Sequence, residues 1–145
     1  MISKDIKETS QIAEVFLEKI LKEIRIKNKA LVVGLVGNLG AGKTTFLQSV
    51  AKHLGVKRKV SSPTFVIMKK YPLKNKKHKF LFHLDAYRLK NEQELLHLGW
   101  EEIIKDENNL VFIEWPQNVS KIMPKHTKYI QISEDKKGQK VFKFK

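Results

Sequence analysis

The sequence predicts a three-layer α/β fold with a mostly parallel sheet and antiparallel additions. Stretches with helical spacing of apolar residues alternate along the chain with short apolar runs, which is typical of a sheet covered by helices on both faces. Residues 30–36 and 110–113 are continuous apolar runs, as expected for strands buried on both faces. A chain of 145 residues can bury one sizeable core but is too short for two ordinary domains. We therefore expect residues 1–145 to form a single domain.

The first half of the chain alternates helix, strand and helix. Residues 9–27 predict an amphipathic helix with Thr9 or Ser10 as its N-cap, because apolar residues recur at every fourth position, at Ile12, Phe16, Ile20 and Ile24. Residues 30–36 predict the first buried strand. A second helix is predicted over residues 43–54, and Gly55 ends it.

The second half of the chain adds five strands and a broken helix. The strands are predicted, in chain order, at residues 65–68, 80–84, 110–113, 129–133 and 140–144. A lysine-rich turn, residues 72–79, joins the first two of them, and Lys137-Gly138 predicts an antiparallel hairpin between the last two. Residues 92–105 have helical composition with an interruption at Gly99.

The composition excludes several classes of function. The chain has no cysteine, so disulfides and thiolate catalysis are excluded, and a metal ion would need oxygen or imidazole ligands. The longest apolar run is residues 30–36, whereas a membrane-spanning helix needs roughly 20 apolar residues. The N-terminal residues lack the apolar core of a secretory signal. We expect a cytoplasmic protein without a membrane partner.

The net charge of +14 is concentrated in one part of the chain. Residues 24–84 contain 14 of the 29 basic residues and none of the 15 acidic residues. Such a window is typical of a protein that contacts a polyanion. It is equally typical of a solvated lysine surface, because only three of the 29 basic residues are arginines, the residues that make bidentate phosphate and base contacts.

The phosphate-binding pattern G-x-x-x-x-G-K-[ST] occurs as Gly37-Asn38-Leu39-Gly40-Ala41-Gly42-Lys43-Thr44. It lies between a predicted buried strand and a predicted helix, which is the context that such a loop requires. The pattern therefore predicts a P-loop NTPase-like fold and a Mg²⁺-dependent nucleotide-binding protein. We favour this interpretation over a glycine-rich turn without a ligand.

The residues of this loop have distinct expected roles. Its glycines let the backbone turn N–H groups toward phosphates at the N-terminus of the following helix. Lys43 would reach the β- and γ-phosphates, and the hydroxyl of Thr44 would hold Mg²⁺. The nucleotide-binding residues predicted here are Gly37, Asn38, Leu39, Gly40, Ala41, Gly42, Lys43, Thr44 and Thr45.

Two carboxylates follow apolar runs and are candidates for binding Mg²⁺ or the attacking water. Asp85 follows residues 80–84, and Glu114 follows residues 110–113. Magnesium held by a hydroxyl and phosphate oxygens commonly takes a carboxylate from the end of a neighbouring buried strand. Either residue could bind the metal, orient the water or face solvent; we favour Glu114 for the metal and Asp85 for water or metal support. The candidate catalytic residues are therefore Asp85, Glu114 and the P-loop lysine, Lys43.

Two residues beside these carboxylates allow two interpretations. His83 alternates with apolar neighbours, and a histidine in such a strand is more often a core or edge residue than a catalyst. Trp115 follows Glu114 and could belong to the core or form a wall of the ligand site.

Four further motifs accompany the P-loop. They are Ser62-Pro63-Thr64-Phe65, His83-Leu84-Asp85-Ala86-Tyr87-Arg88-Leu89, Leu98-Gly99-Trp100-Glu101-Glu102 and Glu114-Trp115-Pro116. Each is weak by itself, but in this order and spacing the set closely resembles the TsaE (YjeE) family, the bacterial ATPases of tRNA threonylcarbamoyladenosine biosynthesis. The resemblance covers roughly residues 9–116.

This resemblance implies a function in tRNA modification. A member of the family would support threonylcarbamoylation of N6 of adenosine 37 (t6A37) in tRNAs that read codons beginning with A. It would not transfer the carbamoyl group itself. It would bind the TsaD–TsaB complex and hydrolyse ATP with Mg²⁺, slowly when alone, to sustain turnover. Its contact with tRNA would be indirect, or direct through the basic window.

The resemblance also implies roles for single residues. Those that match the family's phosphate and metal positions are Lys43, Thr44, Asp85 and Glu114. Trp115 is placed in the nucleotide site, and Thr64 resembles a mobile switch residue near the γ-phosphate. Thr9 resembles a threonine near the adenine, and Lys140 resembles a basic residue near the nucleotide.

Three other functions compete with this one. A small-molecule P-loop kinase would close an arginine-bearing lid over the transferred phosphate, and only Arg88 adjoins a candidate site residue. A GTPase would carry a guanine-reading tetrapeptide, Asn-Lys-x-Asp or Thr-Lys-x-Asp, which is absent from the sequence. A basic RNA-binding module without catalysis would use the basic window, with Tyr71, Phe80 and Phe82 as stacking residues.

Overall fold

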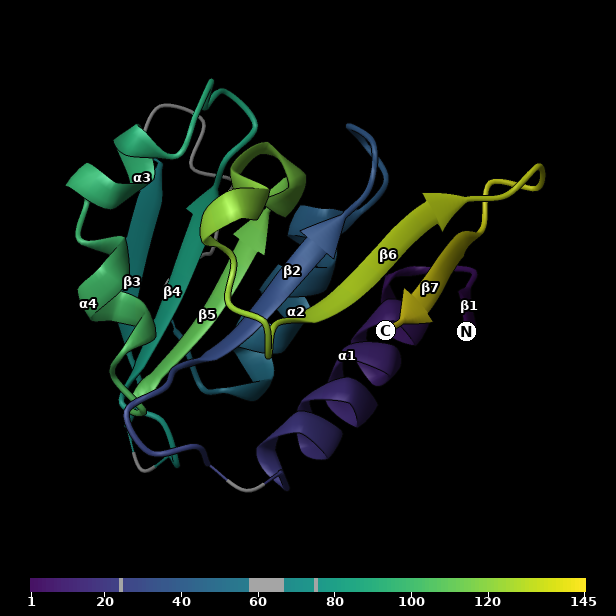
Figure 1. The fold of residues 1–145 in the computed structure, drawn as a ribbon. Helices are drawn as coiled ribbons and strands as arrows, with labels where there is room; N and C mark the ends of the chain where they lie inside the picture. The colour runs from purple at the N-terminus through teal and green to yellow at the C-terminus, as the bar shows by residue number, and fades with distance from the viewer. Residues whose placement is uncertain (24, 58–66, 75) are drawn as a thin grey trace.

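The computed structural model describes residues 1–23, 25–57, 67–74 and 76–145. They form a seven-stranded sheet in the order β1-β7-β6-β2-β5-β4-β3, with helices on both of its faces (Figure 1). The predicted three-layer α/β fold is therefore confirmed.

Four parallel strands form the centre of the sheet. They are β6 (Lys128–Glu134), β2 (Leu31–Val36), β5 (Asn109–Glu114) and β4 (Phe80–Asp85). Every residue of β5 is buried, as are the four inner residues of β2, because helices cover both faces of a parallel sheet. Since β2, β4 and β5 run in one direction, their C-terminal ends meet at one edge of the sheet and their N-terminal ends at the opposite edge.

Antiparallel strands extend the sheet on both sides. β3 (Met68–Pro72) pairs with β4, β7 (Lys140–Phe144) pairs with β6, and β1 (Ile2–Ser3) pairs with β7. β6 and β7 form the predicted hairpin. Because β1 joins this hairpin, the two ends of the chain lie close together (Figure 1).

Two long helices cover one face of the sheet, α1 (Ile6–Leu21) and α2 (Lys43–His53). The ring centroid of Phe46 on α2 lies 6.0 Å from that of Phe16 on α1 and 5.4 Å from that of Phe142 on β7. These aromatic contacts join both helices to the antiparallel side of the sheet in a single hydrophobic core.

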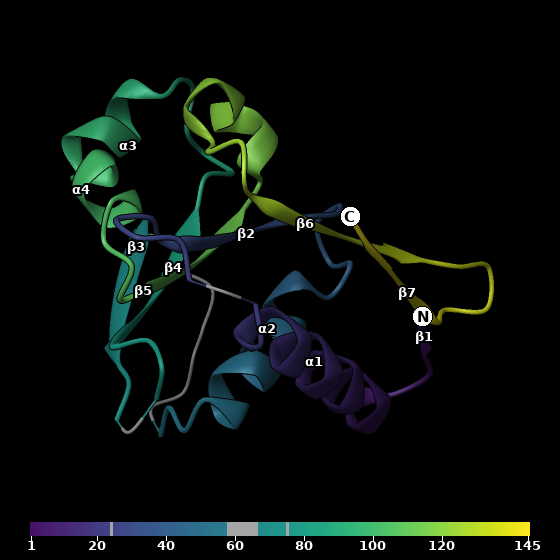
Figure 2. The same ribbon diagram turned by 60° about the horizontal axis from the view of Figure 1, so that its bottom comes forward.

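The other face is covered by short helices, as Figure 2 shows. These are α3 (Gln93–His97), α4 (Trp100–Ile104) and the 3-10 helix η1 (Pro116–Ile122). Trp100 is fully buried, and its indole N–H donates a hydrogen bond of 3.0 Å to the carbonyl oxygen of Ile122. The predicted interruption at Gly99 is confirmed, since this residue has φ = 88° and separates α3 from α4. None of the helices in the described ranges has the length and apolarity needed to cross a membrane.

The predicted start of the first helix is wrong. α1 begins at Ile6, because a carboxylate oxygen of Asp5 accepts a hydrogen bond of 2.8 Å from the backbone N–H of Glu8 and caps the helix. Thr9 lies inside the helix, where it is buried and its hydroxyl is 2.6 Å from the hydroxyl of Ser3.

Two further boundaries differ from the prediction by more than one residue. α1 ends at Leu21 rather than at residue 27. β3 spans Met68–Pro72 instead of residues 65–68, of which residues 65 and 66 lie outside the described part of the chain. The antiparallel pairing of β3 with β4 sets its position, and this pairing is a long-range property that local composition does not encode.

Candidate active site

A tight loop connects the end of β2 to the start of α2 and contains the P-loop sequence. Gly42 has φ = 109°, a backbone conformation that residues with a side chain rarely adopt. At Gly37, a Cβ atom would lie 2.5 Å from the carbonyl oxygen of Ile132 in β6. The local geometry therefore requires glycine at both positions.

The N-terminus of α2 faces this loop. Its N-cap is Gly42, which provides no capping side chain, and its first turn contains no acidic residue. The first N–H groups of a helix have no partner within the helix, and the helix dipole adds positive potential at the same point. This arrangement can bind the phosphate groups of a ligand.

A cavity of about 230 Å³ lies where the loop meets the ends of β4 and β5. It is lined by Leu39, Gly40, Gly42, Lys43, Thr44, Thr45, Asp85, Glu114 and Trp115. Each of these is a site residue that the sequence predicts, and Gly37, Asn38 and Ala41 complete the loop beside them. The fold thus brings together residues from three separate segments of the chain.

Lys43 is buried at this cavity. Its ammonium group donates hydrogen bonds to the carbonyl oxygens of Gly37 and Asn38, the second at 3.1 Å. Burial lowers the pKa of Lys43, while the nearby carboxylates of Glu114 and Asp85 act in the opposite direction. The ammonium group is held by neutral carbonyl oxygens. An anion can displace them because the attraction between two opposite charges adds to the hydrogen bond.

Asp85 and Glu114 lie opposite each other at the ends of β4 and β5, where they are register partners. Glu114 is only 3% exposed, whereas Asp85 is half-buried. One carboxylate oxygen of Asp85 accepts a hydrogen bond of 3.0 Å from the backbone N–H of Tyr87. The two carboxylates therefore face the same cavity, but Asp85 is more exposed to solvent than Glu114.

His83 is fully buried on β4, and its Nε2 atom lies 2.6 Å from Oε2 of Glu114. A buried carboxylate requires such a partner, because burial without one is costly. The sequence favours His83 as a core or edge residue and does not predict this contact. A signal was present: alternate residues of a strand share a face, so His83 and Asp85 lie on the same side of β4.

Trp115 adopts a left-handed backbone conformation, with φ = 60° and ψ = 48°. This conformation is uncommon for a non-glycine residue and costs on the order of 1–3 kcal/mol. The ring of Trp115 lies 4.5 Å from the ammonium nitrogen of Lys43 and packs against Tyr87 with the ring centroids 4.9 Å apart. Because Trp115 is half-buried and lines the cavity, this geometry favours a wall of the ligand site over a pure core position.

A second cavity, of about 180 Å³, shares Gly42 and Thr45 with the first. Thr9 and Lys140 both line it, although they lie at opposite ends of the sequence. The ammonium group of Lys140 donates a hydrogen bond of 3.1 Å to the carbonyl oxygen of Gly40 in the P-loop. The pairing of β1 with β7 thus places both residues beside the phosphate-binding loop.

Thr64, the predicted switch residue, lies outside the described residues with the rest of its motif. Within the ranges that the structure describes, no group of three or more His, Asp or Glu side chains could hold a metal ion by itself. A Mg²⁺ ion here would take phosphate oxygens as ligands in addition to Thr44 and one or two carboxylates, which is the usual manner of Mg²⁺ binding to nucleotide sites.

The sequence matches known proteins over most of its length. Residues 3–142 match the family described as "Threonylcarbamoyl adenosine biosynthesis protein TsaE". The chain is 39% identical over 101 residues to the "tRNA threonylcarbamoyladenosine biosynthesis protein TsaE" of Bacillus subtilis, a match that covers 70% of this chain and 60% of that protein. It is 38% identical over 93 residues to the protein of the same name from Rickettsia felis, covering 63% of this chain and 52% of the relative. The matches thus span between half and two thirds of the length of these relatives.

A solved structure has a similar fold. The crystal structure of Bacillus subtilis YdiB superimposes with a TM-score of 0.70 at 25% sequence identity, covering 99% of this chain and 82% of that one. The similarity extends over both helical layers and the sheet between them. The predicted P-loop NTPase-like fold is therefore confirmed.

Proposed function

This chain belongs to the TsaE family of threonylcarbamoyl adenosine biosynthesis proteins, and we propose that it is a Mg²⁺-dependent ATPase that supports t6A37 formation in tRNA in the cytoplasm. One observation carries the proposal: the P-loop lysine, the P-loop threonine and two strand-end carboxylates line a single cavity. A fold alone does not identify a reaction. This set of side chains supplies a phosphate ligand, metal ligands and a group that can orient water.

Lys43 would bind the β- and γ-phosphates of ATP. Its ammonium group already lies at the mouth of the loop, on the carbonyl oxygens of Gly37 and Asn38. Anionic phosphate oxygens attract an ammonium group more strongly than neutral carbonyl oxygens do, because both partners are then charged. We therefore expect the ammonium group to leave these carbonyls for the phosphates, while the N–H groups at the start of α2 bind the same anion.

The hydroxyl of Thr44 and the carboxylate of Glu114 would bind a Mg²⁺ ion between the loop and β5. His83 holds Oε2 of Glu114 at 2.6 Å, which fixes the direction in which the other oxygen, Oε1, can point. We favour Glu114 as the metal ligand because its position is fixed in this way. Bound Mg²⁺ would neutralise charge that develops on the β- and γ-phosphate oxygens.

Asp85 would orient the attacking water, directly or together with the metal. Its carboxylate lines the same cavity and is more exposed than that of Glu114. In the hydrolysis step, the water oxygen bonds to the γ-phosphorus as the bond from that phosphorus to the β–γ bridging oxygen breaks. The electron pair of the broken bond remains on ADP, and the water proton passes to the departing phosphate or to solvent.

The second cavity would hold the adenosine part of the nucleotide. It adjoins the phosphate cavity at Gly42 and Thr45, so a nucleotide that fills both would cross the N-terminus of α2. Thr9 would lie near the base, and Lys140 near the ribose or the α-phosphate.

Turnover by the isolated chain would be slow. Neither of the two described arginines, Arg25 and Arg88, lines the phosphate cavity, and an arginine supplied to such a site typically accelerates hydrolysis about 10³- to 10⁵-fold. We propose that the TsaD–TsaB complex binds this chain and completes or orders its site. Contact with tRNA would follow through that complex.

Replacement of the P-loop lysine tests the nucleotide site directly. We expect Lys43→Ala to weaken ATP binding by about ten-fold or more and to abolish phosphate release, because the charged phosphate ligand is lost. The matched control is Lys52→Ala, which removes an exposed lysine of the same helix. Calorimetry with Mg²⁺ and ATP, together with a phosphate-release assay, measures both effects. Unchanged affinity and hydrolysis in Lys43→Ala would refute the proposal.

A further inference from the structure

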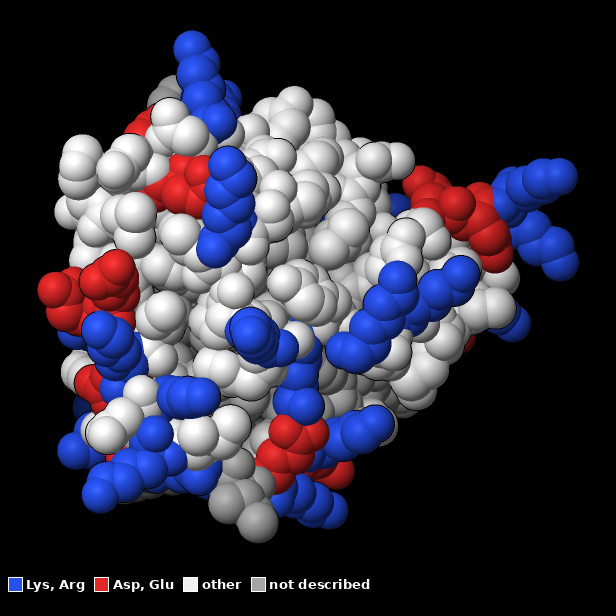
Figure 3. Space-filling model, in the orientation of Figure 1, with Lys and Arg blue, Asp and Glu red and all other residues white. Residues whose placement is uncertain are grey.

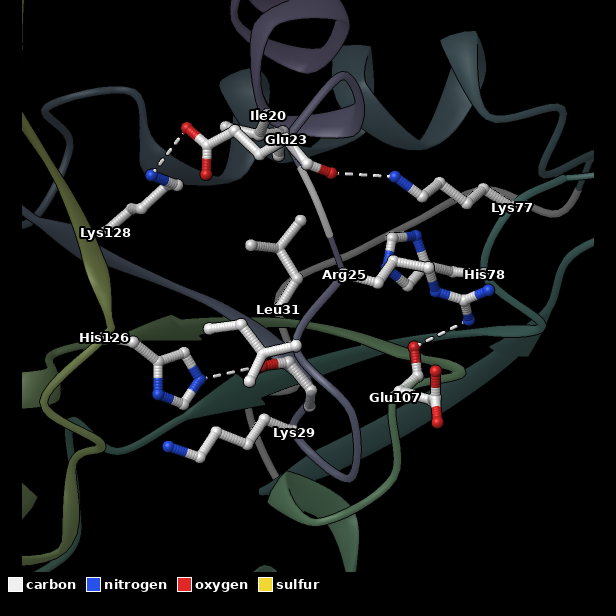
Figure 4. Close-up of a pocket in the computed structure, with 12 residues that line it drawn as sticks. Ile20, Glu23, Arg25, Lys29, Leu31, Lys77, His78, Glu107, His126 and Lys128 are labelled. Atoms are coloured by element: carbon white, nitrogen blue, oxygen red, sulfur yellow. Dashed lines mark hydrogen bonds and ion pairs between the residues drawn. The ribbon is translucent and has the colours of Figure 1, made fainter.

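A third cavity, of about 160 Å³, lies at the edge of the sheet opposite the candidate active site. It is formed where the starts of β2 and β6 meet the segment before β5 and the turn between β3 and β4 (Figure 4). Its cationic and histidine residues are Arg25, Lys29, Lys77, Lys128, His78 and His126. No residue of this cavity lines either of the two cavities at the P-loop.

Two side chains that line this cavity each have a buried nitrogen atom without a hydrogen-bond partner among the described residues. These atoms are Nε of Arg25 and Nδ1 of His78, and His78 is only 4% exposed. Buried polar atoms in native proteins nearly always have a partner, which can be a ligand or an ordered water molecule. Since both side chains line one cavity, a polar group bound between them would give both atoms a partner.

The guanidinium group of Arg25 is fixed by its other contacts. Its Nη2 atom donates hydrogen bonds to the carbonyl oxygen of Glu107 at 2.8 Å and to Oδ1 of Asn108 at 3.1 Å, the first of which is drawn in Figure 4. Both partners lie before β5, so the guanidinium cannot turn toward bulk solvent without losing them. The Nε–H group is therefore a donor with a fixed position.

The charge of the cavity favours an anion. Four cationic side chains and two carboxylates, those of Glu23 and Glu107, line it. Lys128 neutralises Glu23 at 2.8 Å, while the ammonium group of Lys77 binds the backbone carbonyl oxygens of Leu21 and Glu23. Lysine and arginine side chains also predominate at the lower edge of the surface in Figure 3, where the strands β2, β4 and β5 begin in Figure 1.

His78 can donate a hydrogen bond without carrying a charge. Burial, with the charges of Arg25 and Lys77, lowers the pKa of His78 to about 4. Near pH 7 its ring is neutral, and one of its two nitrogens then carries a hydrogen. In the tautomer that carries this hydrogen on Nδ1, a bound anion would accept from that N–H group and from the charged guanidinium together.

We propose that this cavity is a second anion site, in which Nε of Arg25 and Nδ1 of His78 donate hydrogen bonds to a phosphate group. The phosphate is either free inorganic phosphate or part of an RNA backbone, since both present the same oxygens. The lysine-rich turn of residues 72–79 contributes Lys77 and His78 to the cavity. The site uses no residue of the proposed ATPase site, so it stands independently of that function.

Site-resolved NMR of the full chain tests the proposal. The probe is inorganic phosphate, titrated in the presence of Mg²⁺ and a non-hydrolysable ATP analogue so that the P-loop is occupied. We expect saturable shifts of the Nε–H signal of Arg25 and of the ring signals of His78. The amide signals of Gly42 and Thr44 report separately on any phosphate at the P-loop. If the Arg25 and His78 signals do not move up to tens of millimolar phosphate, the two nitrogens bind water and the anion site does not exist.

Two variants of His78 test whether its Nδ1–H group donates a hydrogen bond to phosphate or whether its ring only packs in the cavity. His78→Phe keeps a ring but loses both nitrogens, and we expect at least ten-fold weaker phosphate binding. His78→Asn can place an amide N–H near the position of Nδ1 and should retain most of the affinity. Lys136→Gln on the exposed β6–β7 turn is the control for a loss of charge alone. Equal binding by the Phe variant and the wild type would overturn the assignment.

A second titration distinguishes the two sources of phosphate. The probe is a short single-stranded RNA. If it displaces inorganic phosphate, and if its affinity falls steeply with salt and is lower for Arg25→Gln than for the wild type, the RNA backbone is the source. Saturable phosphate binding that RNA does not displace identifies the free ion. Thermal unfolding of each variant confirms that the compared proteins are folded. If RNA displaces phosphate equally well from Arg25→Gln and from the wild type, the role of Arg25 is contradicted.

Discussion

At the scale of single residues, the contact between His83 and Glu114 does most to define the candidate active site. The carboxylate of Glu114 is nearly inaccessible, and His83 is its hydrogen-bond partner at 2.6 Å. Partners of this kind orient a ligand side chain and raise its affinity for metal. We therefore regard His83 as a positioning residue that acts through Glu114.

Replacing His83 should weaken Mg²⁺ binding more than nucleotide binding. We expect His83→Phe to raise the Mg²⁺ concentration needed for half-maximal hydrolysis by roughly 10- to 100-fold, with a much smaller change in affinity for metal-free ATP. His83→Gln can place an amide nitrogen near the position of Nε2 and should restore part of the loss. His97→Gln, on the exposed end of α3, is the control. An equal loss of both affinities in His83→Phe would indicate a general structural role.

The positions of single residues in the fold can be predicted from sequence where spacing along the chain carries the information. The P-loop pattern and the strand-end positions of Asp85 and Glu114 could be read from local context. The hydrogen bond between His83 and Glu114 could not be predicted, because it depends on β5 lying next to β4 in a particular register. The backbone conformation of Trp115 was also hidden, since nothing in its neighbours requires a positive φ.

At the scale of secondary-structure elements, the β6–β7 hairpin reaches the candidate active site. It carries Lys140 to the P-loop, where the ammonium group contacts the carbonyl oxygen of Gly40 at 3.1 Å. We expect Lys140→Met, which keeps the apolar stem but removes the charge, to weaken ATP binding about five-fold, equivalent to about 1 kcal/mol. Lys143→Met alters an exposed lysine of the same strand and should have no effect. Equal ATP affinities in the two variants would exclude Lys140 from the site.

The N-terminus of α1 depends on its cap. Because Asp5 accepts a hydrogen bond from the N–H of Glu8 at 2.8 Å, Asp5→Ala should lower the free energy of unfolding by about 1 kcal/mol. Glu14→Ala, on the exposed face of α1, provides the comparison. Urea denaturation measures both, and a loss of similar size in Glu14→Ala would show that Asp5 has no special role.

The elements were largely predictable because apolar periodicity reports burial directly. Buried strands such as β2 and β5 are continuous apolar runs, and Gly99 marks the break between α3 and α4. The start of α1 was misplaced because both Asp5 and Thr9 are good caps, and burial of Thr9 against Ser3 decides between them. That choice is made by tertiary contacts rather than by helix propensity.

At the scale of the whole molecule, the parallel sheet separates two kinds of site. The C-terminal ends of β2, β4 and β5 carry the P-loop and its carboxylates, while their N-terminal ends border the basic cavity around Arg25 and His78. Ligands of open parallel sheets usually bind at the C-terminal edge. The proposed anion at the opposite edge would therefore not interfere with a nucleotide bound at the P-loop.

The proposed dependence on a partner also belongs to the scale of the whole molecule. The described phosphate cavity contains a lysine, a hydroxyl and two carboxylates but no arginine. We expect phosphate release to accelerate when the TsaD–TsaB complex is added, and Glu114→Gln to remove this acceleration while leaving complex formation intact. A phosphate-release assay with and without the complex, with co-elution as the control for binding, measures this. Equal rates in both conditions would show that the site is complete by itself.

Reconstituted tRNA modification tests the central claim most directly. Purified TsaD–TsaB complex from the same source, its substrates and a tRNA that reads codons beginning with A are incubated with ATP and Mg²⁺, and t6A is measured over many turnovers. The account predicts sustained modification with this protein, and at most a few turnovers without it or with Lys43→Ala. Equal multi-turnover modification in the presence and absence of the protein would contradict it.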